Sequence, residues 1–189
     1  DMKCGLNLST VTPIALTLSL WIGLGTCFNC QSVEGADGLL EKAQGVFAKL
    51  PEKMPGAEED TPAKIRLGKK LYFETAISIN RTQSCNSCHR LDENLGGVDN
   101  QPTSTGAEGK LGGRNAPTTL NAGLHIAQFW DGRSPNLADQ AKGPVLNPIE
   151  MGMPDAASVL KRLEEEGYGR QFKRVFPDAD KPLTYDNHA

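Results

Sequence analysis

Residues 84–90 of the chain read S-C-N-S-C-H-R, and this short stretch decides what the rest of the chain must fold around. Cys85 and Cys88 are separated by two residues, and His89 follows directly. This C-x-x-C-H spacing is the attachment pattern of c-type haem. The two cysteine sulfurs would form thioethers with the porphyrin vinyl groups, and His89 would bind the iron through Nε2. The spacing therefore predicts one covalently bound haem c.

Two other uses of the same side chains compete with haem attachment. A Cys₂His₂ zinc site would need His125 or His188 as a further ligand, at separations far from those of zinc fingers. A redox dithiol would leave His89 without a role, and no βαβ pattern lies nearby. Only two cysteines follow residue 30, and both belong to the motif. Haem attachment is the interpretation that uses all three side chains.

The N-terminal segment predicts export. A mostly apolar run, VTPIALTLSLWIGLGTCF, covers residues 11–28, and small and polar residues come next. Val33 and Gly35 suit the −3 and −1 positions of a signal-peptide cleavage site. Residues 1–35 are therefore predicted to be a signal peptide. An N-terminal membrane segment is the alternative, because the apolar run approaches the length of a bilayer span.

Composition limits the possible structures and partners of the remaining chain, 36–189. Cleavage after Gly35 would remove the three other cysteines, Cys4, Cys27 and Cys30, so no disulfide is expected. The whole chain has 189 residues, which suits one domain with appendages. Its formal net charge of −3, with both signs mixed, gives no electrostatic sign of nucleic-acid binding, so no such partner is expected.

Apolar residues at helical spacing predict several short helices and no strand. One pattern runs from Leu39 to Leu50 and stops at Pro51. Capping signals predict three more helices, which are 61–72, opened by Thr61 and Pro62, 155–167, capped by Asp155 and ended by Gly167, and a short one around Phe172. Residues 94–115 show no periodicity, and a loop of that length usually has a function or wraps around something.

The expected fold class is all-α, a loop-rich, cytochrome c-like haem domain with short helices around one covalently bound haem. The chain has few large apolar side chains for its size. A buried porphyrin would supply the missing apolar core.

The motif alone leaves open whether the haem carries electrons or does chemistry. A single-haem electron-transfer cytochrome needs a second axial ligand, and Met151 lies 62 residues after His89 in N-P-I-E-M-G-M-P, with Met153 beside it. An enzyme instead needs an open iron face with a titratable group next to it, and Glu150 in the same segment offers one. Spacing does not choose between the two functions.

The chain resembles the N-terminal haem domain of bacterial dihaem cytochrome c peroxidases, relatives of the methylamine-utilisation dihaem enzymes. The blocks that carry the resemblance are L-G-K-K-L-Y-F-E at 67–74, the haem motif, G-G-V-D-N-Q-P-T-S-T-G at 96–106, R-N-A-P-T at 114–118, Q-F-W-D-G-R at 128–133, and L-A-D-Q-A-K-G-P-V at 137–145 followed by I-E-M. The match keeps this order from about Leu39 to the end of the chain.

This resemblance implies a periplasmic enzyme that reduces hydrogen peroxide to water. Electrons would come from a small cytochrome c or a cupredoxin. The resemblance also implies a second haem in the full-length protein, and a homodimer of that protein.

Roles for single residues follow from the resemblance. Glu150 matches the catalytic acid/base, and Gln140 matches the glutamine beside the peroxide site. Trp130 matches an aromatic side chain between the two haems, and Asn115 matches a ligand of the inter-domain calcium, which needs six to eight oxygen ligands in all. The corresponding structural interpretations are a surface carboxylate, a helix-surface amide and a core tryptophan.

The sequence departs from the family pattern at two places. Family members commonly carry a histidine that caps the peroxidatic iron, in the loop after P-T-S-x-G, where this chain has Ala107. The chain also ends without a second C-x-x-C-H motif. We therefore expect a resting iron without the loop ligand, and a chain that is a fragment lacking the second haem domain.

Overall fold

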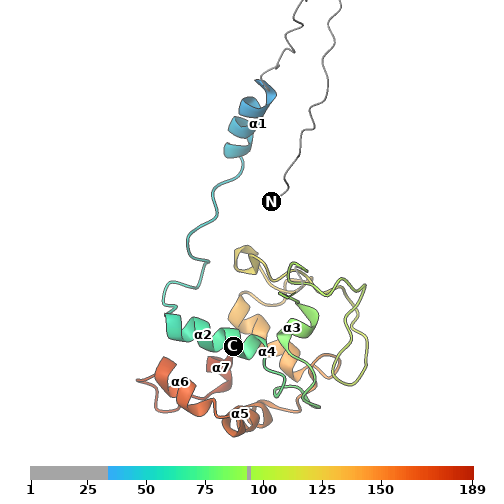
Figure 1. Ribbon diagram of the computed structural model, residues 1–189, viewed down its shortest axis with the longest axis vertical. Helices are drawn as coiled ribbons and strands as arrows, with labels where there is room; N and C mark the ends of the chain where they lie inside the picture. Colours follow the sequence, from blue (N-terminus) through green and yellow to red (C-terminus); the bar gives the residue numbers. More distant parts are fainter. Residues whose placement is uncertain (1–33, 93–94) are drawn as a thin grey trace, which may run out of the picture. The chain divides into compact units, whose positions relative to one another are not determined.

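The computed structural model describes residues 34–92 and 95–189, and over these residues the chain forms short helices joined by long loops (Figure 1). The chain divides into two units, of which the second is Leu50–Ala189. The first contains helix α1, Glu34–Gln44. The described residues contain no β-strand, and the expected all-α, loop-rich class is confirmed there.

Helix α1 is shorter than its sequence pattern predicts. The pattern continues to Leu50, whereas the helix ends at Gln44. Gly45 follows directly, and glycine is the residue that most readily ends a helix. Val46 and Phe47 are 78% and 73% exposed, so no packing supports a further helical turn. The prediction of a helix over 45–50 is therefore wrong.

The N-terminal predictions are largely outside what the structure describes. The apolar run 11–28 lies there entirely, so the signal peptide, its membrane-segment alternative and the boundary at residue 35 stay predictions. Within 34–92 and 95–189, no helix is both long enough and apolar enough to cross a bilayer.

The unit Leu50–Ala189 contains six α-helices and one 3₁₀ turn among its described residues. They are α2 (Pro62–Tyr72), α3 (Cys85–Cys88), η1 (Ala122–Leu124), α4 (Leu137–Leu146), α5 (Ala156–Glu165), α6 (Gly169–Val175) and α7 (Tyr185–His188). In Figure 1 helices α2 and α6 lie side by side, α7 lies by α4 and α5, and α3 lies among the green and yellow loops.

Capping residues set the helix boundaries as predicted. The Thr61 hydroxyl accepts a hydrogen bond from the Lys64 N–H at 3.2 Å, which opens α2. The Asp155 carboxylate accepts from the Ser158 N–H at 2.7 Å and opens α5. After α5 the chain reverses at Gly167, whose φ of +78° suits glycine.

Helix α4 agrees with the structural interpretation of Gln140 as a helix-surface amide, although no periodic pattern or cap predicted its bounds. Asn136 caps it by accepting from the Asp139 N–H at 2.9 Å. Pro144 lies inside the helix and cannot donate to the carbonyl one turn earlier, at Gln140. The helix ends two residues later at Leu146, and the chain turns sharply from Asn147.

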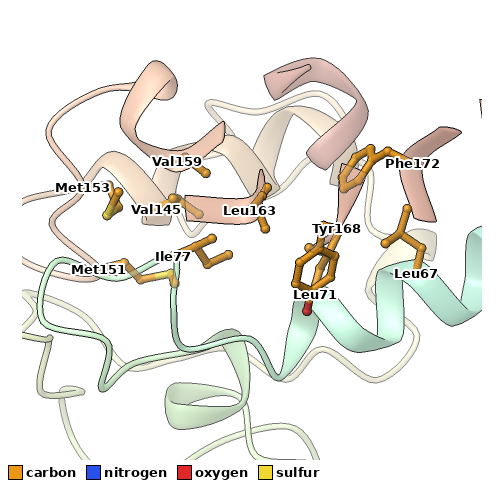
Figure 2. Close-up of a cluster of buried hydrophobic side chains, with 10 residues drawn as sticks. All are labelled: Leu67, Leu71, Ile77, Val145, Met151, Met153, Val159, Leu163, Tyr168 and Phe172. Atoms are coloured by element: carbon orange, nitrogen blue, oxygen red, sulfur yellow. The ribbon is translucent and has the colours of Figure 1, made fainter. Parts of the chain in front are cut away.

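One core cluster holds the second unit together (Figure 2). Helix α2 packs on α6, and α7 packs on both α4 and α5. The buried side chains are Leu67, Leu71, Ile77, Val145, Met151, Met153, Val159, Leu163, Tyr168 and Phe172. At one end of the cluster, Met151 and Met153 lie near Ile77 and Val145. The cluster is small for a unit of this length, as the sequence predicts for a chain that needs a cofactor to complete its core.

The loops are held by hydrogen bonds to side chains. Arg162 of α5 donates to the carbonyls of Ala76 and Ile79, each at 2.9 Å, and also to that of Ser78. This single guanidinium therefore fixes the segment that leads into the C-x-x-C-H motif. The stretch 95–115 contains no helix, as predicted, and its one isolated β-bridge joins Thr105 to Leu111.

Candidate functional site

The C-x-x-C-H motif forms a single helical turn. Helix α3 spans Cys85 to Cys88, and His89 is its C-cap, with its N–H donating to the Cys85 carbonyl at 2.9 Å. The Ser87 hydroxyl accepts from the Ser84 N–H at 3.0 Å and holds the start of the turn. One turn places both cysteines and the histidine beside each other, which is the local geometry that haem attachment requires.

The imidazole of His89 has a fixed orientation. Its Nδ1 lies 2.9 Å from the carbonyl oxygen of Pro117. A carbonyl oxygen can only accept, so Nδ1 must carry the proton. The neutral ring then keeps its lone pair on Nε2, the atom that binds iron. The Tyr72 hydroxyl donates to the His89 carbonyl and fixes the backbone of the same residue.

The two cysteines are present as protonated thiols. Burial raises the pKa of the Cys85 thiol to about 11. Burial also raises the pKa of Cys88, and the negative charges of Asp99 and Glu150 add smaller increases. A redox dithiol needs a lowered thiol pKa, so this environment does not support that alternative.

A zinc site is not supported either. Within the described ranges 34–92 and 95–189, no three or more His, Cys, Asp and Glu side chains gather closely enough to hold a metal ion. Of the two histidines that such a site would recruit, His125 is exposed at the end of η1. His188 is stacked on Tyr185 with ring centroids 5.4 Å apart, and burial lowers its pKa to about 4.

A buried hydroxyl beside the motif lacks a strong hydrogen-bond partner within the protein, which is consistent with a bound group at this place. The Ser104 hydroxyl oxygen is buried and makes no geometrically acceptable hydrogen bond. The Cys88 sulfur is its neighbour, and their contact lowers the pKa of Cys88 against the larger effect of burial. A thiol or thioether sulfur is a weak hydrogen-bond partner, so the Ser104 hydroxyl has no strong partner within the protein. Together with the free Nε2 of His89, it makes the residues here suitable for haem.

Glu150 lies at the tip of a tight turn that follows α4. Its N–H donates to the Asn147 carbonyl at 3.0 Å, and so does the Gly152 N–H at 2.9 Å. Gly152 has a φ of +72°, a conformation that glycine adopts without strain. The Asn147 side-chain amide donates to Glu150 Oε1 at 2.7 Å. The carboxylate is thus held by Asn147, and its negative charge is the smallest of the contributions to the raised pKa of Cys88.

Glu150 also lines a cavity of about 470 Å³. The other lining residues are Phe129, Arg133, Ser134, Asp139, Lys142, Gly143, Leu146, Asn147 and Tyr185. Phe129 has a φ of +63°, a strained conformation for an aromatic residue. Its ring lies 3.4 Å from the Arg133 guanidinium carbon. Strain of this kind is common where a side chain is held for a function.

Gln140 shares a face of α4 with Asn147, because the two residues are seven positions apart on the helix and its cap. Its side chain is half-buried and is not part of the cavity wall. Gln140 therefore lies on α4, the helix that precedes the turn of Glu150. It is about one helical turn before Gly143.

Trp130 and Asn115 are joined directly to each other. Trp130 is 64% exposed, so it is not a core residue. Its indole N–H donates to the Asn115 carbonyl at 2.7 Å. The Asn115 side-chain amide donates to the Gln101 carbonyl at 2.6 Å. Both side chains lie on the loop surface, and a calcium ligand role for Asn115 stays a prediction.

Met151 faces away from the exposed loops. It is 4% exposed and packs in the core cluster (Figure 2). Its N–H donates to the Pro144 carbonyl at 3.2 Å, and its carbonyl accepts from the Ile79 N–H at 2.8 Å. The side chain is thus already buried among apolar neighbours, which is the position of a core residue.

Sequence reasoning missed the residues that hold the others in place. Pro117 fixes the tautomer of His89 from 28 positions away, and no local pattern reports such a contact. Asn147 precedes a proline, and an Asn-Pro pair is a turn signal that could have drawn attention to it. Phe129 gave no signal, since its backbone strain is visible only in three dimensions.

The loop that contains Ala107 is fixed against the backbone of Glu150. The Ala107 N–H donates to the Glu150 carbonyl at 2.7 Å, and the Asn80 side-chain amide donates to the Ala107 carbonyl. Gly106 approaches so closely that a Cβ there would lie 1.7 Å from the Ile149 carbonyl oxygen. The position at which relatives are expected to carry a histidine therefore adjoins the candidate catalytic segment.

The fold and this set of side chains fit the class of helical c-type haem domains. The family model described as "Di-haem cytochrome c peroxidase" matches residues 62–189. The chain belongs to this family. The match includes the motif, the Ala107 loop, α4 and the Glu150 turn.

Named relatives agree with the family. The chain is 40% identical over 158 residues to the cytochrome c551 peroxidase of Pseudomonas aeruginosa, covering 82% of this chain and 44% of the relative. It is 38% identical over 141 residues to the methylamine utilization protein MauG of Paracoccus denitrificans, covering 64% of this chain and 36% of the relative. The chain thus spans less than half the length of these two proteins.

A solved structure shares the fold. The crystal structure of a MauG-like protein associated with microbial copper homeostasis superposes with a TM-score of 0.63 and 28% identity. The superposition covers 75% of this chain and 43% of the other. The helical arrangement around the motif is therefore that of the dihaem family, whose membership implies haem c as the cofactor.

Proposed function

We propose that this chain is the haem domain of a periplasmic peroxidase that reduces hydrogen peroxide to water. Electrons would come from a small cytochrome c or a cupredoxin. The observation that carries the proposal is Glu150, a carboxylate that lines a cavity and is held there by a hydrogen bond from Asn147. The names of the relatives, which include a cytochrome c551 peroxidase, support the same activity.

Three residues would hold the cofactor. Cys85 and Cys88 would form the thioethers, and His89 would bind the iron through the Nε2 that its contact with Pro117 leaves available. Bound haem supplies an iron centre that takes up peroxide and exchanges electrons with it. A second haem, in the full-length protein, and a homodimer of that protein belong to the same proposal.

Glu150 would manage the protons of the reaction. Hydrogen peroxide must lose a proton to become a good ligand, and its outer oxygen must gain one to leave as water. A single carboxyl group can accept the first proton and return it in the second step. The cavity beside Glu150 gives a small polar molecule room to reach the carboxylate.

Gln140 and Trp130 would assist in different ways. Gln140 lies outside the wall of the Glu150 cavity, and from the same helix it would donate a hydrogen bond to peroxide bound at the iron or orient it, without adding a charge. Trp130 would lie on the route by which electrons arrive. Its exposed ring, held by Asn115, is available for contact with another domain or protein. A calcium ion at Asn115 would then affect the same indole through the shared residue.

The alternative function, a single-haem electron carrier with Met151 as the axial ligand, has less structural support. Met151 is buried in the apolar core of the unit. Glu150, by contrast, already lines the cavity.

Paired substitutions test the proposal. Glu150→Gln should slow the reaction of the haem-loaded protein with peroxide by about 10²–10⁴-fold, the usual contribution of a general acid–base group, while the haem absorption spectrum stays nearly unchanged. Glu108→Gln, at an exposed carboxylate of the neighbouring loop, is the matched control and should have little effect. Stopped-flow absorbance measures both.

Met151→Leu separates the two functions. In a peroxidase it should change the rate with peroxide little, because leucine conserves the volume of the core side chain. If it instead removes a sulfur-to-iron charge-transfer band, Met151 is the ligand and the carrier function is correct.

A further inference from the structure

Asn147 is the most heavily hydrogen-bonded residue in the turn that carries Glu150. Its N–H donates to the carbonyls of Gly143 and Pro144 at 3.1 and 3.3 Å, which closes α4. Its carbonyl accepts from the N–H groups of Glu150 and Gly152. Its backbone is therefore fixed on both sides, by the helix before it and by the turn after it.

The side chain of Asn147 is fixed as well. Its Oδ1 accepts from the Ile149 N–H at 3.0 Å. Because an N–H can only donate, this contact determines which side-chain atom is the oxygen. The amide nitrogen must then point the other way, where it donates to Glu150 Oε1 at 2.7 Å. The Asn147 side chain therefore presents an N–H donor to Glu150. Rotating the amide to present its oxygen would break the bond from the Ile149 N–H.

We propose that Asn147 is the positioning residue for Glu150, donating to one carboxylate oxygen and so holding the group in one orientation toward the cavity. A hydrogen bond to a carboxylate oxygen favours the ionised form over the neutral one. The inference rests on the proposed function, because it assigns Asn147 to the proton transfer that Glu150 performs. It adds a residue whose only role in the reaction is through Glu150.

Other charged and titratable groups surround the same carboxylate. The cavity contributes Arg133, Asp139, Lys142 and Tyr185, α3 contributes Cys88, and Lys110 of the neighbouring loop reaches the Pro148 carbonyl. Several of them are already paired, Lys142 with Asp186 at 2.6 Å and Lys110 with Glu108 at 2.9 Å. Asn147 is the neighbour whose hydrogen bond to the Glu150 carboxylate the structure records.

The substitution Asn147→Asp isolates this one hydrogen bond. Aspartate has nearly the same shape and keeps the oxygen that accepts from Ile149, so the turn is retained. The donor to Glu150 becomes a second carboxylate at about the same place. Two carboxylates in contact cannot both ionise easily, so one of them holds its proton to higher pH.

The pH dependence of the peroxide reaction gives the first readout. In the haem-loaded protein, the acid limb of the rate profile should move upward by about one pH unit or more in Asn147→Asp, since like-charged carboxylates raise each other's pKa by that order. At a pH on that limb, the rate should fall about tenfold for every pH unit by which the limb moves. The haem spectrum should stay unchanged.

Asn136→Asp is the matched control. Asn136 caps the other end of the same helix with an oxygen that aspartate also has, so the net charge changes equally and the cap remains. Its rate profile should match that of the unsubstituted protein. If Asn147→Asp and Asn136→Asp give the same profile, Asn147 has only a structural role and the inference is overturned.

Infrared difference spectroscopy supplies a readout that does not depend on activity. The carboxyl band that disappears in Glu150→Gln belongs to Glu150, and its titration midpoint should rise in Asn147→Asp. An unchanged midpoint overturns the inference, whatever the activity of Glu150→Gln. A raised midpoint together with full activity of Glu150→Gln keeps Asn147 as the residue that positions Glu150, and shows instead that the proposed proton transfer is wrong.

Discussion

The side chains of the haem motif differ in what holds them. His89 is held by Pro117 on its ring and by Tyr72 on its carbonyl. The two cysteines are half-buried thiols, and only covalent bonds would use them. Attachment and ligation are therefore separable properties of neighbouring residues.

This separation leads to a prediction for the cysteines. Expressed with the c-type maturation machinery, the protein should gain the mass of one haem. After acidic acetone extraction, the Cys85→Ala, Cys88→Ala double variant should lose its haem, because no thioether remains. Each single variant should keep it through one thioether. Mass spectrometry before and after extraction measures both, and an unmodified mass of the unsubstituted protein would contradict the assignment.

The motif could be predicted from sequence because its chemistry needs neighbouring residues, and spacing reports neighbours. Glu150 and Gln140 could be suggested only through resemblance, since nothing local distinguishes them from surface side chains. The supporting contacts from Pro117 and Asn147 join backbone and side-chain atoms that folding brings together. Such contacts leave no periodicity or spacing in the sequence, so only the structure shows them.

Among the elements, the loop 104–112 and the turn 147–152 behave as one structure. The Ala107 N–H donates to the Glu150 carbonyl, and the two backbones meet where Gly106 has no side chain. The Lys110 ammonium also reaches the Pro148 carbonyl, at 3.4 Å. The position of Glu150 thus depends on a loop far earlier in the chain.

Gly106→Ala should disrupt this contact. The new Cβ would lie 1.7 Å from the Ile149 carbonyl oxygen, so one of the two backbones must move. We expect the free energy of unfolding to fall by about 1–3 kcal/mol, the range for overpacking, and the peroxide reaction to slow as Glu150 is displaced. Denaturant titration and stopped-flow absorbance measure the two effects.

Gly113→Ala is the control for this substitution. A Cβ at Gly113 meets no atom within 4 Å, and its φ is outside the left-handed region. Its free energy of unfolding should change by less than about 0.5 kcal/mol. Equal free energies of unfolding of the two variants would contradict the close approach of Gly106 to the Ile149 carbonyl.

Helix boundaries show where local sequence is sufficient. Thr61 and Asp155 mark the starts of α2 and α5 correctly, because a capping hydrogen bond involves residues three positions apart. The bounds of α4 were not predicted, since Pro144 interrupts the helix pattern locally, whereas packing on α7 supports the helix. The pattern over 45–50 failed in the opposite way, since periodic apolar residues without a packing partner do not stabilise a helix.

At the scale of the whole molecule, the core and the site occupy different regions of the unit Leu50–Ala189. The core cluster joins α2, α4, α5 and α6, and Met151 faces it (Figure 2). Glu150, the preceding residue, lines the cavity instead. Under the proposed function, Met151 would serve stability and Glu150 chemistry, so the axial-ligand and proton-transfer roles of this segment can be tested independently.

The same arrangement predicts the resting state of the iron. Ala107 occupies the loop position at which the resemblance implies a histidine ligand, and a methyl group cannot bind iron. His125 is exposed at the end of η1, and His188 is stacked on Tyr185. The ferric haem should therefore be five-coordinate or water-bound, and electron paramagnetic resonance of the oxidised protein should show a high-spin signal. Ala107→His should convert it to a low-spin signal and slow the reaction with peroxide. A low-spin signal in the unsubstituted protein would contradict the prediction, and its loss in His125→Ala would identify the ligand.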